Sequence, residues 1–106
     1  MKPEKSALLI GLAWLACATA SQAQDAQALR TRSLAATCGQ CHGTDGRAID
    51  GAAVPGLAGL PASYLVEQMN AFKSGARPAT VMHQIARGYS DAQIDQLARY
   101  FAAQPK

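Results

Sequence analysis

The sequence predicts an all-α domain, and three observations support that prediction. Apolar residues recur at helical spacing after residue 62, as in Leu65, Met69 and Phe72. No segment shows a sustained alternation of apolar and polar residues, the pattern of a half-buried strand. Seven residues between 43 and 61 are glycine or proline, which indicates turns rather than regular structure. With 106 residues in all, we expect one small domain of helices and Gly/Pro-rich loops.

The N-terminus has the layout of a secretory signal peptide. Two lysines precede an apolar run at 7–18, and small residues follow it as far as Ala23. The run is shorter than the roughly 20 residues that a membrane-spanning helix needs. We expect residues 1–23 to be cleaved, leaving 24–106 as a single exported domain in the periplasm without a membrane span. An uncleaved anchor, or a lipoprotein modified at Cys17, stays open as an alternative.

The expected mature chain excludes several classes of function. Residues 24–106 carry eight basic and six acidic side chains, a net charge of +2. No basic run or basic patch with interleaved aromatics is present, so nucleic-acid binding is not expected. The chain is too short for a dinucleotide-binding domain beside a substrate domain. No paired carboxylates, nucleophile–base pair or phosphate-binding loop is apparent, so we expect no catalytic residues.

The first three segments are assigned from their composition and periodicity. Residues 26–38 form one expected helix, rich in alanine and leucine, and the turns of 43–61 follow it. A second helix is expected at 62–74, with Gly75 as the residue that ends it. Pro78 then forces the preceding residue into an extended conformation.

The last two helices carry clear boundary signals. A short helix is expected at 81–87, ending at Gly88. Ser90 is a helix N-cap residue, and Gln93 three positions later completes a capping box. The helix that follows has one apolar stripe, formed by Ile94, Leu97, Ala98 and Phe101.

The sequence from Cys38 to His42 is C-x-x-C-H, the attachment signature of a c-type haem. Two cysteines three positions apart on a helical turn can form thioethers with both vinyl groups of one porphyrin, and the next histidine ligates the iron. A covalent cofactor also suits so small a core, which needs additional support to be stable. The alternatives are a zinc site using Cys38, Cys41, His42 and His83, and a thioredoxin-like dithiol, which would need a βαβ context.

The second axial ligand of the iron determines the chemistry. The candidates are Met69, Met82 and His83. Met69 lies on an apolar helix stripe and is expected in the core, whereas His83 is expected at the surface. Met82 follows the extended stretch at Pro78, where the chain can cross the far side of the haem, and is our expected ligand. Ligation by His42 and Met82 leaves no open position and favours one-electron transfer.

These features resemble the small class I cytochromes c, in the haem motif, Gly43, Gly46, Met82 and the aromatic C-terminal helix. Residues 72–90 are more narrowly similar to the haem subunits of flavocytochrome c sulfide dehydrogenases. The resemblance implies a periplasmic electron-accepting subunit that partners an FAD-containing flavoprotein acting on sulfide or a related sulfur compound. It likewise implies thioethers at Cys38 and Cys41, with His42 and Met82 as axial ligands.

The resemblance has two departures. Many class I cytochromes carry Gly-Pro after the haem motif, and that proline carbonyl orients the proximal histidine. The dipeptide at the matching place here is Gly51-Ala52, so the carbonyl partner of His42 stays open. The family's cytochrome subunits often carry two haem domains, whereas one C-x-x-C-H motif predicts one haem here.

Two questions stay open at this stage. A freely diffusing shuttle to a terminal oxidase or reductase would use the same haem and ligands, whereas a haem sensor or peroxidase would need an open axial position. Lys73, Arg77 and Arg87 could form a basic patch near the haem edge or an ordinary solvated face.

Overall fold

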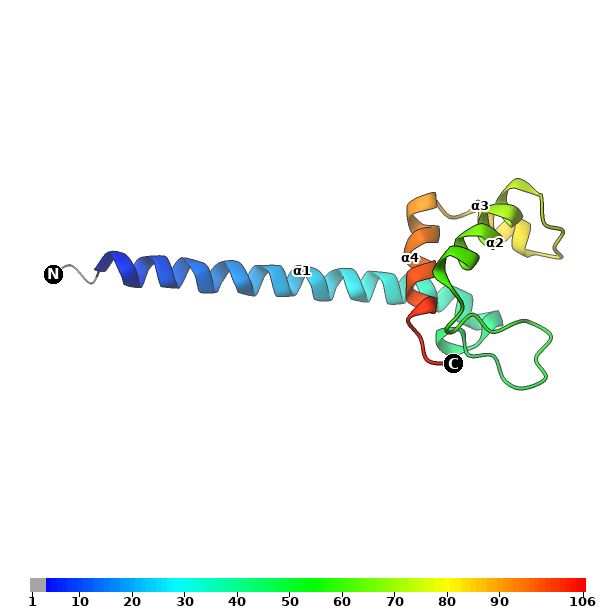
Figure 1. The fold of residues 1–106 in the computed structure, drawn as a ribbon, viewed down its shortest axis with the longest axis horizontal. Coiled ribbons are helices and arrows are strands. Elements are labelled where there is room, and N and C mark those ends of the chain that lie inside the picture. Colours follow the sequence, from blue (N-terminus) through cyan, green and yellow to red (C-terminus); the bar gives the residue numbers. More distant parts are fainter. Residues whose placement is uncertain (1–3) are drawn as a thin grey trace. The chain divides into compact units, whose positions relative to one another are not determined.

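The computed structural model describes residues 4–106, with side chains from residue 18 onward. The described chain contains four α-helices, one short 3-10 helix and no strand, which confirms the predicted all-α class (Figure 1). In chain order these are α1 (Glu4–His42), η1 (Thr44–Gly46), α2 (Ala62–Ser74), α3 (Met82–Arg87) and α4 (Asp91–Ala102).

The chain divides into two units, Met1–Arg30 and Thr31–Lys106. The first is helical from residue 4, and its side chains at 18–30 are exposed. The expected signal peptide at 1–23 falls in this unit, with residues 1–3 outside the described chain, and its removal stays a prediction. No helix in the described residues is both long enough and apolar enough to cross a membrane.

The helix boundaries follow the local signals closely. Helix α2 spans the predicted residues and ends at Gly75, whose φ of 83° is left-handed. Helix α3 begins one residue later than predicted, because Val81 is its N-cap. Ser90 and Gln93 form both hydrogen bonds of the predicted capping box at the start of α4. The exception is α1, which begins at Glu4 instead of the predicted residue 26 and continues past residue 38, so that it includes the whole C-x-x-C-H motif.

The core of the second unit joins α2 and α4 to the last turns of α1. Its buried cluster consists of Ala35, Leu65, Leu97, Ala98 and Phe101. Ile94 completes the apolar stripe of α4 and is 1% exposed. Helix α2 contacts both α3 and α4. The core is thus small and built mainly around α4, as the predicted stripe required.

The Gly/Pro-rich segment at 43–61 is more ordered than its composition indicates. It contains η1, which the sequence did not predict, and the Gly46 carbonyl accepts hydrogen bonds from the amides of Leu57 and Ala58. A Cβ atom on Gly46 would lie 2.8 Å from the Phe101 ring, so only glycine allows this close approach to α4. Further along, the Gly59 amide donates to the Phe101 carbonyl. These contacts hold the loop against the end of α4.

Candidate functional site

The C-x-x-C-H motif occupies the C-terminal end of α1. Cys38 and Cys41 are three positions apart, so their side chains lie on the same side of the helix. Cys38 is half-buried and Cys41 is exposed, and neither forms a disulfide. Two thiols at this spacing, followed by a histidine, are the donor set that covalent haem attachment requires.

His42 is oriented by a backbone carbonyl. Its Nδ1 atom lies 2.7 Å from the carbonyl oxygen of Pro55. A carbonyl can only accept, so Nδ1 carries the proton and donates, which leaves Nε2 without a proton and able to bind a metal. A metal-ligating histidine is commonly held in this way, since the contact sets both tautomer and ring orientation.

The structure identifies the carbonyl partner of His42 that the sequence left open. The partner of His42 is Pro55, not a residue of the Gly51-Ala52 dipeptide. The reason lies in the loop, because the two hydrogen bonds to the Gly46 carbonyl fix the chain at Leu57 and so place the residues just before it beside His42. A proline carbonyl therefore contacts the histidine here too, but the proline lies a few residues after the Gly51-Ala52 dipeptide.

The sulfur of Cys38 has two polar neighbours, the hydroxyls of Thr37 and Tyr89. Burial raises the pKa of the Cys38 thiol from 9.0, and the two neighbouring hydroxyls partly offset the rise. The sequence analysis assigned no role to either residue. Tyr89 lies 52 positions from Thr37, so no local pattern indicates that their side chains meet.

The three candidates for the second axial ligand lie on two helices. Met82 is the first residue of α3, and Met69 lies within α2; both are half-buried. The expectation of a surface histidine at 83 is wrong, because His83 is half-buried on α3, which packs against α2. Its Nδ1 atom is a buried polar atom that has no hydrogen-bond partner among the described residues.

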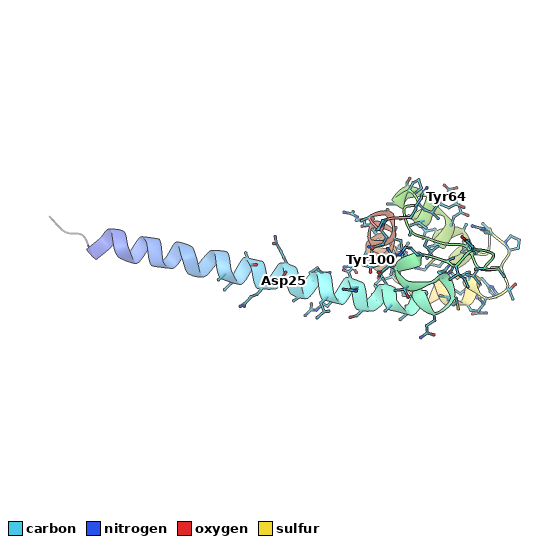
Figure 2. All side chains as sticks on the ribbon, turned by 90° about the horizontal axis from the view of Figure 1, so that it is seen from below. Asp25, Tyr64 and Tyr100 are labelled. Carbon is cyan, nitrogen blue, oxygen red and sulfur yellow. The ribbon has the colours of Figure 1, made fainter. Side chains whose placement is uncertain are left out.

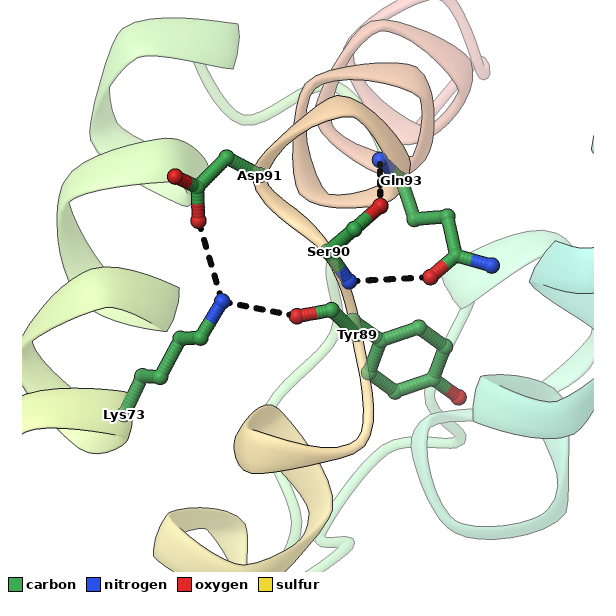
Figure 3. Close-up of polar contacts among 5 residues, drawn as sticks. All are labelled: Lys73, Tyr89, Ser90, Asp91 and Gln93. Atoms are coloured by element: carbon green, nitrogen blue, oxygen red, sulfur yellow. Dashed lines mark hydrogen bonds and ion pairs between the residues drawn. The ribbon is translucent and has the colours of Figure 1, made fainter.

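The three basic residues considered for a patch have different surroundings. Lys73 donates to the Tyr89 carbonyl at 2.8 Å and pairs with Asp91 at 2.9 Å (Figure 3). The Arg77 guanidinium lies over the Phe72 ring, 4.7 Å from its centroid. Arg87 is exposed at the end of α3. Because Lys73 is engaged with α4, only the two arginines are available to a basic surface, and the patch is weaker than the sequence indicated.

The donor set matches the haem interpretation better than its alternatives. Among side chains that the structure describes, no group of three or more His, Cys, Asp or Glu residues is placed to hold a metal ion. The zinc alternative therefore lacks a ligand set there. The thioredoxin alternative lacks its βαβ context, since the described chain has no strand.

A small helical domain with C-x-x-C-H at a helix end and a carbonyl-anchored histidine defines the class of c-type haem proteins. The family model "Cytochrome c" matches residues 28–104, and the chain belongs to the cytochrome c family. Its cofactor is covalently attached haem c, with Cys38 and Cys41 at the required spacing, and it is an electron carrier.

Two relatives are named for thiosulfate dehydrogenase and sulfide dehydrogenase. It is 37% identical over 101 residues to the thiosulfate dehydrogenase electron acceptor of Stutzerimonas stutzeri, covering 92% of this chain and 47% of the relative. It is 36% identical to the cytochrome subunit of sulfide dehydrogenase from Chlorobaculum tepidum, covering 68% and 64% respectively. The chain thus spans less than half of the first relative and under two thirds of the second.

A solved structure supports the fold. Cytochrome c4 of Acidithiobacillus ferrooxidans superposes with a TM-score of 0.58 at 36% identity, over 62% of this chain and 37% of the other. The class I cytochrome c fold expected from the resemblance is therefore confirmed.

Proposed function

We propose that Cys38 and Cys41 form the thioethers of the single haem, with His42 and Met82 as its two axial ligands. The observation that carries the proposal is the hydrogen bond from His42 Nδ1 to the Pro55 carbonyl. That bond directs Nε2 toward a metal and raises its basicity as a ligand. A methionine opposite such a histidine raises the reduction potential relative to a second histidine.

Bound in this way, haem c supplies a one-electron couple, and the protein supplies its environment. The Gly46 and Pro55 carbonyls keep the proximal loop in place, so His42 need not reorient when the iron changes oxidation state. With both axial positions taken by side chains, the iron has no site for peroxide or oxygen. This arrangement favours electron transfer over the sensor and peroxidase alternatives.

The electron donor that we propose is a periplasmic dehydrogenase of inorganic sulfur compounds, with a flavoprotein sulfide dehydrogenase as the specific case. The resemblance of residues 72–90 to flavocytochrome haem subunits supports this donor, as do the two relatives named for thiosulfate and sulfide dehydrogenases. We further propose export to the periplasm, with residues 1–23 removed as a signal peptide. Covalent haem attachment outside the cytoplasm is consistent with that export.

A freely diffusing shuttle is the second candidate function. The similarity to cytochrome c4, which is not named as a subunit of a dehydrogenase, favours it. The two functions require the same haem and ligands, so the behaviour toward partner proteins separates them.

The ligand assignment is tested with Met82→Ala, using Met69→Ala as the matched control because both methionines are half-buried on helices. In the haem-loaded protein we expect Met82→Ala to abolish the near-infrared absorption of the methionine–iron bond, lower the reduction potential and admit cyanide or imidazole to the iron. Met69→Ala should keep all three properties. Loss of the absorption in Met69→Ala alone would transfer the assignment to Met69, and an unchanged spectrum in both variants would rule out methionine ligation.

The partner is tested by native mass spectrometry of the protein purified gently from its own periplasm. A mass equal to one chain, one haem and a flavin-containing protein would support the dehydrogenase subunit, with sulfide and thiosulfate as the first electron sources to assay. A lone haem-loaded chain, reduced equally well by unrelated donors, would contradict the dehydrogenase assignment and support the shuttle.

A further inference from the structure

Tyr89 connects the segment that carries Met82 to the helix that carries the haem motif. Its hydroxyl lies 2.9 Å from the Thr37 hydroxyl on α1. Thr37 donates its only hydroxyl proton to the Leu34 carbonyl, at 2.8 Å. Tyr89 is therefore the donor to Thr37, and the bond has a defined direction.

The same tyrosine hydroxyl reaches the first haem-attachment residue. The hydroxyls of Thr37 and Tyr89 are the polar neighbours of the Cys38 sulfur. The tyrosine thus contacts two consecutive residues of α1, one of them a proposed thioether. This contact lies at the haem-bearing end of the helix rather than at a remote point on it.

The backbone of Tyr89 is held from the other side of the chain. Lys73 on α2 donates to its carbonyl at 2.8 Å and is itself fixed by Asp91 at the start of α4. Ser90, the next residue, is locked by the capping box with Gln93. In Figure 3 the Tyr89 ring extends away from the lysine, so the residue spans between α2 and α1.

Helix α3 packs against α2 but buries little of its own surface. It has six residues, begins at Met82, and completely buries only Ala86, which is 0% exposed. Its N-cap residue, Val81, is 52% exposed and makes no side-chain cap. At the other end the Tyr89 amide donates to the Ala86 carbonyl, so a hydrogen bond joins Tyr89 directly to the last turn of α3. A helix this short has little stability of its own and depends on tertiary contacts for its position.

We propose that Tyr89 is a positioning residue that retains Met82 on the iron by tying α3 to the haem-bearing end of α1. The inference rests on the proposed ligation by Met82. Without the tyrosine hydroxyl, α3 keeps its packing against α2 but loses this side-chain link to α1. The methionine then leaves the iron more readily, and an external ligand competes more effectively for the vacant position.

The test measures imidazole binding to the ferric, haem-loaded protein through the loss of the methionine–iron absorption. We expect Tyr89→Phe to bind imidazole about three to ten times more tightly than the wild type, the effect of one lost hydrogen bond. Tyr64→Phe is the matched control, because Tyr64 lies on α2 with 44% of its surface exposed (Figure 2) and should leave the affinity unchanged. Global unfolding in denaturant is measured in parallel, since a merely structural role would lower stability without changing ligand exchange in the native state.

Thr37→Val provides a second variant, which removes the acceptor instead of the donor and decides the question if Tyr89→Phe fails to mature. Both variants should tighten imidazole binding, and the double variant should add little to either. Affinities equal to that of Tyr64→Phe would overturn the proposal. Met82→Ala in the same assay distinguishes the ligation by Met82 from the positioning by Tyr89. If Met82→Ala binds imidazole no better than the wild type, the proposed ligation fails. If Met82→Ala binds imidazole more tightly and Tyr89→Phe does not, only the role of Tyr89 fails.

Discussion

Gly43 directly follows His42 and is the residue at which the chain leaves α1. Its φ of 85° and ψ of 157° lie in a region that is essentially restricted to glycine. A Cβ atom there would lie 2.9 Å from the Ala48 nitrogen and closer still to the carbonyl of Arg47. The substitution Gly43→Ala therefore meets both backbone strain and a clash with backbone atoms that cannot rotate away.

The cost can be worked out from these two terms. The conformation alone costs an alanine about 1–3 kcal/mol. Relief of the clash requires the turn to open, which breaks the 2.8 Å hydrogen bond from the Gly46 amide to the Gly43 carbonyl and costs about 1 kcal/mol more. We expect Gly43→Ala to lower the free energy of unfolding by about 2–4 kcal/mol in total.

Gly51 provides the matched control, because it also has a positive φ, 78°, but its Cβ would have no atom within 4 Å. Gly51→Ala should cost only about 1–2 kcal/mol, the conformational term. Both variants are measured in the haem-loaded protein by guanidinium unfolding, followed by far-ultraviolet circular dichroism. If the two losses agree within about 0.5 kcal/mol, the close approach at Gly43 contributes nothing and the reasoning is refuted.

Three further outcomes are expected. Phe101→Ala should cost about 3–5 kcal/mol, since the ring is 3% exposed in the core; a loss below about 1 kcal/mol in denaturant unfolding would contradict that packing. Ser90→Ala should cost about 1 kcal/mol by removing the cap of α4, and thermal unfolding checks this. The hydrogen bond to Asp45 raises the pKa of Tyr100 above 10.0, so its stabilisation is present below that pH and lost as the pH rises through the folded-state pKa. Tyr100→Phe should flatten this alkaline loss, and an unchanged pH profile would show that the bond is not coupled to folding.

Much of the fold could be predicted because its signals are local. The stripe of α4, its capping box and the glycine after α2 each depend on residues within a few positions of one another. The haem motif is equally local, since its cysteines and histidine act through one helical turn. Such features depend on backbone geometry that neighbouring residues impose. The structure reproduces the helices after α1 within a residue or two, whereas α1 extends beyond both of its predicted ends.

The basic patch shows where this reasoning stops. The composition placed three cations in one region, but Lys73 is engaged with Asp91 and with the Tyr89 carbonyl, 16 positions away. A charge count does not reveal such a contact, because it depends on where α4 begins relative to α2 in space. The histidine at 83 was assigned to the surface for a similar reason, since its burial depends on packing between helices.

The sequence by itself determined the helical class and the covalent haem, and it predicted His42 as the histidine that binds the iron. Only the tertiary structure decided which carbonyl orients that histidine and which side chain ties α3 to α1. The physical reason is the distance along the chain. His42 and Pro55 are separated by 13 residues and Thr37 and Tyr89 by 52, so these contacts depend on the paths of loops and the packing of helices, which no local pattern specifies.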